Sequence, residues 1–130
     1  MSLDVEVLGA RVLPADEVGR LVALAVARAG IAAGHVAVAF VGAEEIAALN
    51  AEHRGKQGPT DVLSFPVDEA GPVAGPPETR ELGDIVICAE HTDDLREAVV
   101  HGALHLVGYD HEADDGEMLA VQDEIMAALR

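Results

Sequence analysis

Hydrophobic and polar positions along the chain follow two different periods. Residues 3–8 alternate with a period of two, which is typical of a strand with one buried face. Residues 35–41 and 83–88 are short and mostly apolar, which indicates strands buried on both faces. Residues 61–65 form a fourth run of this kind, and Pro66 ends it. The pattern therefore predicts four strands.

Segments with a helical period lie between these strands and after the last one. Apolar residues recur every three to four positions over residues 14–29, with Pro14 at the start and acidic residues in the first turn. Further helices are predicted over residues 43–53, from about Thr92 onwards, and over residues 114–129. The pattern therefore predicts four helices in addition to the four strands.

Two loops interrupt the pattern. Residues 54–60 are rich in glycine and end in Pro-Thr, and residues 69–79 contain two glycines and three prolines without any period. Because only the second loop separates strands 61–65 and 83–88, we expect these two strands to form an antiparallel hairpin. No repeat or linker divides the chain, so residues 1–130 are predicted to form a single domain.

Composition limits the class of protein further. The chain has 130 residues, half of them hydrophobic, but its aromatic residues are only Phe40, Phe65 and Tyr109, so Val, Leu, Ile and Ala must build the core. A single cysteine, Cys88, excludes an intramolecular disulfide and is typical of a reducing compartment. The N-terminus lacks the features of a signal peptide, and no apolar run approaches the ~20 residues of a membrane span. We therefore expect a soluble, cytoplasmic protein.

Three histidines carry the strongest chemical signal. His101, His105 and His111 stand at offsets of 0, 4 and 10, with Gly108 at offset 7. Residues four apart share one face of a helix, and a glycine one turn later can end the helix and return the chain. Three neutral imidazoles around one ion leave a tetrahedral position open, which is the arrangement of a catalytic zinc site.

The same spacing occurs in metzincin proteases, where a glutamate after the first histidine is the general base. Here Gly102 stands at that position. Two histidines four apart are more often surface or packing residues, but the third histidine and the glycine favour ligands. The spacing thus predicts a metal site without peptidase chemistry.

Three segments, in the same order, resemble the motifs of the YbeY-type endoribonucleases. Residues 101–111 resemble the signature H-G-x-L-H-L-x-G-Y-D-H of that family. Residues 54–66, which run from Arg-Gly-Lys to Ser-Phe-Pro, resemble its second motif, and residues 82–87 its third. Three motifs in order are far more specific than one metal motif. On these motifs, the chain is identified as a member of this family.

The resemblance implies an α+β fold with a four-stranded mixed sheet and helices around a central metal-bearing helix. It implies a zinc-dependent single-strand endoribonuclease that acts in 3′-end maturation of small-subunit rRNA and in ribosome quality control. The metal-binding histidines of the family correspond to His101, His105 and His111, and its functionally important arginine to Arg54. The segment from Cys88 to the first histidine is shorter than is usual in the family, which affects the expected fit of the substrate more than metal binding.

Arg54 and Lys56 are the candidates for contacts with RNA. Attack on a phosphodiester gathers negative charge on the non-bridging oxygens, and a guanidinium stabilises that charge. The resemblance favours this role for Arg54 over that of a surface cation paired with a carboxylate. For Lys56, a phosphate contact and a solvated side chain are equally compatible with the sequence.

Other polar residues receive weaker assignments. Asp110 could orient a histidine or cap the turn, and Glu97 is more typical of a solvated helix glutamate than of a distant base. Ser64 lies in a strand without a visible activating base, so no nucleophile is predicted there. The remaining histidines receive no role; they are His35, His53 and His91.

The acidic balance of the chain opposes binding to free nucleic acid. The formal net charge is −16, and residues 81–130 hold 13 carboxylates against two arginines. Such a surface repels polyphosphate. We therefore expect weak binding of isolated RNA and recruitment to rRNA by a ribosomal protein or an assembly factor.

Two alternatives remain: a metal-dependent hydrolase of another substrate, and a non-catalytic assembly factor whose metal is held by four protein ligands, with Cys88 or Asp110 as the fourth.

Overall fold

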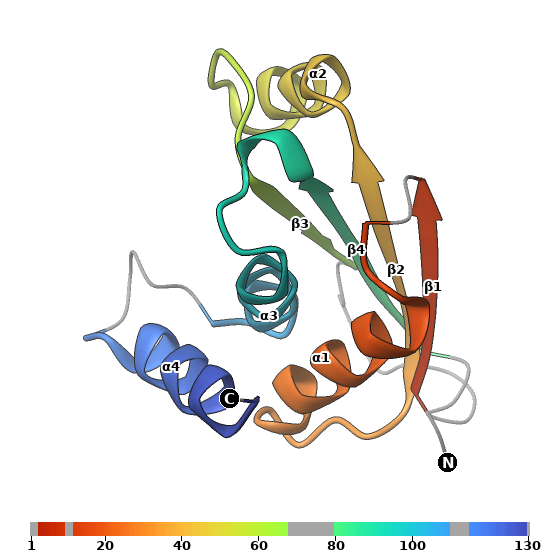
Figure 1. The fold of residues 1–130 in the computed structure, drawn as a ribbon, viewed down its shortest axis with the longest axis vertical. Coiled ribbons are helices and arrows are strands. Elements are labelled where there is room, and N and C mark those ends of the chain that lie inside the picture. Colours follow the sequence, from red (N-terminus) through yellow and green to blue (C-terminus); the bar gives the residue numbers. More distant parts are fainter. Residues whose placement is uncertain (1–2, 10–11, 68–79, 110–114, 130) are drawn as a thin grey trace.

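The computed structural model describes residues 3–9, 12–67, 80–109 and 115–129, and all structural statements concern these residues. They form an α+β fold around one mixed sheet (Figure 1), as predicted. The elements in chain order are β1 (Leu3–Gly9), α1 (Ala15–Ala27), β2 (Gly34–Val41), α2 (Ala43–Arg54), β3 (Val62–Pro66), β4 (Glu81–Cys88), the 3₁₀ turn η2 (Ala89–His91), α3 (Leu95–Leu106) and α4 (Glu117–Leu129).

The sheet has the strand order β1-β2-β4-β3. β1 pairs with β2 and β2 with β4 in parallel, whereas β3 and β4 are antiparallel, with Ser64 opposite Ile85. The predicted hairpin between the third and fourth strands is thus confirmed. β3 lies at one edge of the sheet, which determines the position of the candidate site described below.

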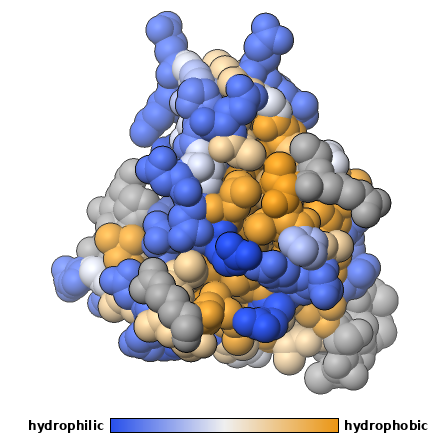
Figure 2. Space-filling view, in the orientation of Figure 1, coloured by the Kyte–Doolittle hydropathy of each residue, from blue (hydrophilic) through white to orange (hydrophobic). Residues whose placement is uncertain are grey.

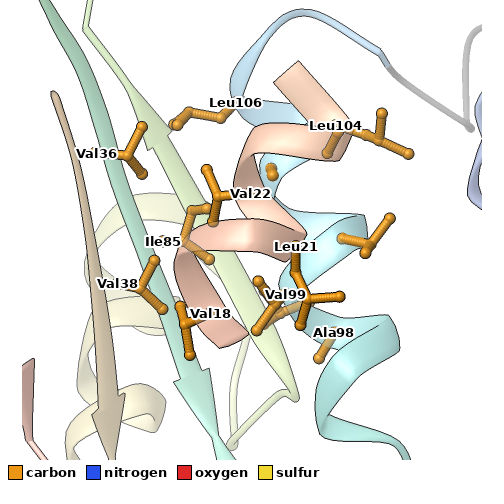
Figure 3. Packing of buried hydrophobic residues seen from close by; sticks show 14 of the residues in the cluster. Val18, Leu21, Val22, Val36, Val38, Ile85, Ala98, Val99, Leu104 and Leu106 are labelled. Carbon is orange, nitrogen blue, oxygen red and sulfur yellow. The ribbon is translucent and has the colours of Figure 1, made fainter. Parts of the chain in front are cut away.

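Helices cover the two faces of the sheet unequally. α1 and α3 pack side by side on one face, and α4 packs on α3 from outside (Figure 1). Figure 3 shows Val18 and Val22 of α1 facing Val38 of β2, with Val99 of α3 on the other side. α2 covers the opposite face, where Ile46 closes a smaller apolar cluster over β3 and β4. The sheet is therefore the middle layer of three.

Helix α3 begins later than the sequence predicted. Instead of a helix from Thr92, the chain forms the 3₁₀ turn η2, and the Thr92 hydroxyl donates a hydrogen bond of 2.6 Å to the carbonyl of Cys88. Asp94 is the N-cap, and its side chain accepts hydrogen bonds from the backbone N–H groups of Arg96 and Glu97. Aspartate at an N-cap satisfies donors that the helix itself leaves unpaired, and this places the start of α3 at Leu95.

The face of the molecule shown in Figure 2 has a hydrophilic rim, and hydrophobic residues gather at its centre, over the sheet between α2 and α1. No helix in the described ranges is long and apolar enough to cross a bilayer.

Candidate active-site cleft

A cleft of about 680 Å³ runs along β3, at the edge of the sheet. Every residue of β3 lines it. Because side chains alternate along a strand, Val62 and Ser64 face α3, whereas Leu63 and Phe65 face α2. The cleft therefore has two walls, one from α3 and the turn after it and one from the end of α2. It is lined by His53, Arg54, Thr60, Asp61, Val62, Leu63, Ser64, Phe65, Pro66, His101, His105, Gly108 and Tyr109.

His101 and His105 of α3 form the centre of the first wall. Their ring centroids are 4.7 Å apart, and the ring planes make an angle of 77°. Nδ1 of His101 lies 2.8 Å from Oε1 of Gln122, and Nδ1 of His105 lies 3.0 Å from the carbonyl oxygen of Tyr109. Amide and carbonyl oxygens accept hydrogen bonds, so in the neutral rings Nδ1 carries the proton and Nε2 carries the lone pair. Both histidines thus have the tautomer that binds a metal ion through Nε2.

The sequence analysis did not identify Gln122. This residue of α4 is 6% exposed and lies 21 positions after the histidine that it contacts. It interrupts the apolar stripe of α4 that consists of Met118, Ile125 and Met126. A buried polar side chain needs a hydrogen-bond partner. The sequence therefore contained a signal for Gln122, since it is a polar residue in an apolar stripe. The helical period of α4 does not show, however, that its partner is His101 on α3.

Gly102 allows α3 to lie unusually close to the sheet. A Cβ atom at this position would lie 2.6 Å from Cγ2 of Ile85 and 3.0 Å from Cγ2 of Val62. The Ser64 hydroxyl donates a hydrogen bond of 2.7 Å to the carbonyl of Gly102. Ser64 therefore connects β3 to α3, the helix that carries His101 and His105. This hydrogen bond gives the Ser64 hydroxyl a structural role, so no nucleophilic role is needed to explain it.

The second wall comes from the last turn of α2. Arg54 is the final residue of that helix, and Gly55 ends it in the left-handed conformation with φ +67°. Arg54 is exposed in the cleft, and within the described ranges no carboxylate lies at ion-pair distance from its guanidinium. Lys56 is exposed on the following loop and does not line the cleft. The structure thus brings Arg54 into the same cleft as two of the predicted ligands, but not Lys56.

The predicted metal site is described only in part. His111 and Asp110 lie outside the described residues, and within those residues no group of three His, Cys, Asp or Glu side chains converges. Cys88 is fully buried in the apolar cluster under α2, with Ile46 and Leu63. It therefore cannot complete a four-ligand site with histidines on α3. The two described imidazoles, each hydrogen-bonded through Nδ1, have the donor chemistry that suits a zinc or similar divalent ion.

His53 was given no role in the sequence analysis, but the structure places it in the cleft beside Arg54. Its ring centroid is 4.9 Å from that of Phe65, at an interplanar angle of 68°. Sequence reasoning missed this contact because the two residues belong to different elements on either side of a loop. The pair forms an aromatic corner at the α2 end of the cleft.

A smaller, acidic cleft of about 410 Å³ adjoins the first. It shares Asp61 and His101 with it and is also lined by Asp93, Asp94 and Glu97. The side chain of Glu97 belongs to this acidic cleft and not to the wall that carries Arg54. The two sides of the histidine helix therefore differ in charge.

The fold and the main cleft define a class of protein. It is a small α+β protein in which a central helix presents paired imidazoles to a cleft along an edge strand, and an arginine at the end of α2 lines the same cleft.

Comparisons with known proteins agree with this class. The sequence profile of the family "Endoribonuclease YbeY" matches residues 15–130. The chain is 38% identical to endoribonuclease YbeY of Bacillus licheniformis over 85% of its own length and 82% of that protein. It is 47% identical to endoribonuclease YbeY of Rubrobacter xylanophilus over 75% of this chain and 69% of that protein. The solution structure of TM1509 from Thermotoga maritima is similar, with a TM-score of 0.52 and 30% identity over 93% of this chain and 85% of that one.

The chain therefore belongs to the endoribonuclease YbeY family. Endoribonucleases are hydrolases that act on phosphodiester bonds, which agrees with a cleft that contains an arginine without a carboxylate partner among the described residues.

Proposed function

We propose that this protein is a zinc-dependent endoribonuclease that cuts single-stranded RNA in the 3′-end maturation of small-subunit rRNA and in ribosome quality control. The observation that carries the proposal is the arrangement of His101, His105 and Arg54 around one cleft in a member of this family. Because the substrate is ribosomal, the proposed location is the cytoplasm.

The metal site in this proposal consists of His101, His105 and His111. These residues would hold a zinc ion, which would supply Lewis-acid polarisation and a bound water of lowered pKa. The protein's own contribution is orientation, since Gln122 and the Tyr109 carbonyl each hold one imidazole by its Nδ1 proton. Hydrogen bonds of this kind fix the ring and increase the basicity of the coordinating nitrogen.

Arg54 is the proposed catalytic residue. Its guanidinium donates up to five hydrogen bonds in a planar fork, which suits the oxygens of a phosphodiester as negative charge develops on them. Since no carboxylate in the described residues neutralises it, its charge is available to the substrate. Lys56, on the adjoining loop, is proposed to contact a flanking phosphate and not the scissile one.

Gly102 also argues against a peptidase. A side chain at this position would point at Ile85 and Val62 in the sheet, not into the cleft. A general base on α3 next to the first histidine is therefore sterically excluded in this packing.

A cleavage assay on precursor small-subunit particles tests the proposal. Wild type, Arg54→Ala and His105→Ala are compared after their zinc content has been measured, with Arg20→Ala, an exposed arginine on α1, as the matched control. We expect Arg54→Ala to keep its metal but to cut about 10²- to 10³-fold more slowly, the usual effect of removing one group that stabilises transition-state charge. His105→Ala should lose both zinc and activity. If Arg54→Ala cuts as fast as Arg20→Ala, the catalytic role of Arg54 is wrong.

Recruitment by a ribosomal protein or an assembly factor completes the proposal. The chain has 24 carboxylates and eight basic residues, and among the residues that line the cleft only Arg54 is a permanent cation. Neutralisation of phosphates supplies most non-specific affinity for nucleic acid, so this chain has little of it. Equilibrium binding of bare single-stranded RNA at physiological salt with a Kd well below about 1 μM, which corresponds to ~8 kcal/mol, would contradict the need for a recruiting partner.

A further inference from the structure

The aromatic corner formed by His53 and Phe65 lies in the cleft and has no function in the mechanism described above. We propose that it is a binding site for one unpaired nucleobase of the RNA strand. This inference rests on the proposed function, and it identifies the feature of the substrate that the α2 wall recognises.

The corner is built by two neighbouring elements. Phe65 points from β3 towards α2 and packs on the cluster of Ile46 and Leu63, so its ring is held in place. His53 comes from the last turn of α2 and is exposed. The ring centroids are 4.9 Å apart and the ring planes make an angle of 68°. The two rings therefore meet edge to face and do not stack in parallel. A planar group that stacks on one ring therefore meets the edge of the other.

The surroundings of the corner favour a nucleobase over an apolar side chain of a protein. His53 is followed directly by Arg54, so one turn of α2 presents both an aromatic ring and a guanidinium to the cleft. A nucleotide offers the matching pair of groups, a flat base and an anionic phosphate. Proteins that bind single strands combine aromatic rings with a cationic groove in the same way.

The geometry also explains a requirement for single-stranded substrate. A base inside a duplex is stacked on both faces, so it cannot stack in the corner formed by His53 and Phe65 without leaving the helix. β3 is the edge strand, and the histidines of α3 lie on its other side. A strand whose base occupies the corner would cross this edge and bring a neighbouring phosphate towards α3. Only a strand free to unstack one base can follow this path.

Fluorescence of oligoribonucleotides that contain 2-aminopurine tests the inference without relying on catalysis. The protein, with its metal removed by EDTA, is titrated into oligonucleotides that carry the probe at successive positions, at low salt so that weak binding is measurable. At one position we expect the fluorescence to fall on binding, because stacking quenches this base. Phe65→Leu keeps an apolar side chain in the cluster but removes the ring. It should weaken binding by about 10-fold or more, the effect of one lost base–aromatic stack.

Phe40→Leu is the matched control. Phe40 is 3% exposed in β2 and does not line the cleft, so the same substitution there should leave RNA binding unchanged. His53→Ala should weaken binding and His53→Phe should restore it. An oligonucleotide with an abasic site at the quenched position should bind wild type and Phe65→Leu equally. The same sequence annealed to its complement should show no quenching.

The results separate the two proposals. If Phe65→Leu and His53→Ala bind the probe as tightly as Phe40→Leu does, or if abasic sites tested at each position in turn never weaken the binding of wild type, the base-binding site is wrong even if the protein cuts RNA. If quenching depends on both rings but wild type with zinc cuts no precursor RNA, the binding site stands and the proposed catalytic function is wrong.

Discussion

The substitution Gly102→Ala tests whether the close packing of α3 on the sheet positions the histidines. The added Cβ would lie 2.6 Å from Cγ2 of Ile85, which is fully buried. Overpacking of this kind costs about 1–3 kcal/mol, and the better helix propensity of alanine recovers up to about 1 kcal/mol. The net loss in the free energy of unfolding in urea is therefore about 0–3 kcal/mol, with an unchanged m-value. A variant that is more stable than wild type by about 1 kcal/mol, as helix propensity alone predicts, would refute the packing argument.

Gly19→Ala is the matched control for this experiment. Gly19 lies within α1, and a Cβ there would meet only Cβ of Val5, at an ordinary contact distance of 3.9 Å. The same change should therefore stabilise the protein, by about 0.5–1 kcal/mol. In the Gly102→Ala background, Ile85→Leu removes the branched methyl that clashes and should recover part of the lost stability. If the effects of Gly102→Ala and Ile85→Leu on the free energy of unfolding are purely additive, the added Cβ does not clash with Ile85.

Three further predictions concern a helix cap, a pH-dependent ion pair and the glutamine behind the first histidine. Asp94→Ala removes the N-cap of α3 and should lower the free energy of unfolding by about 1 kcal/mol in urea titrations; an unchanged midpoint would contradict the cap. Burial lowers the pKa of His35, but the hydrogen bond and charge of Glu81 at 2.7 Å and the hydrogen bond to Glu6 outweigh it, and the net shift raises the pKa above 6.5. Because the folded-state pKa is the higher one, this stabilisation is complete below the unfolded value of 6.5 and is lost as the pH rises through the folded value. His35→Gln should therefore flatten the fall in stability over this pH range, and an unaltered pH profile would count against the ion pairs. Gln122→Leu should weaken zinc binding by about 10- to 100-fold in competition with a chromophoric chelator, whereas an equal affinity would exclude an orienting role.

Features set by local periodicity could be predicted from the sequence. The four strands, the antiparallel pairing of β3 with β4 and the long helix α1 follow from alternation, apolar runs and helical spacing, and the structure contains all of them. Two of the predicted ligands, His101 and His105, line one cleft because residues four apart on a helix must share a face. The start of α3 was misplaced because Thr92 and Asp94 are both favourable N-cap residues, and only the hydrogen bonds identify Asp94 as the cap.

Features that depend on contacts between elements could not be predicted in this way. The contact of Gln122 with His101 joins α4 to α3, and that of His53 with Phe65 joins α2 to β3. A one-dimensional period identifies which side of an element is buried, but not which residue of another element it meets. The family motifs were therefore more informative about His101 and Arg54 than about the residues that orient or accompany them.

The distribution of charge indicates that the residues proposed to cut RNA contribute little to the first encounter with RNA. Within the described residues, carboxylates gather on the side of α3 where Asp93, Asp94 and Glu97 line the acidic cleft, whereas Arg54 lines the main cleft with no carboxylate at ion-pair distance. If Arg54 and Lys56 are the only cations that neutralise phosphates, the slope of log K against log salt for a single strand is about −1.4, far shallower than for proteins that find nucleic acid by charge. Base stacking contributes affinity that does not depend on salt, but it acts only after a strand has reached the cleft. Under the two proposals made above, the cleft selects an unpaired nucleotide at close range, and a partner that carries positive charge brings the protein to the RNA.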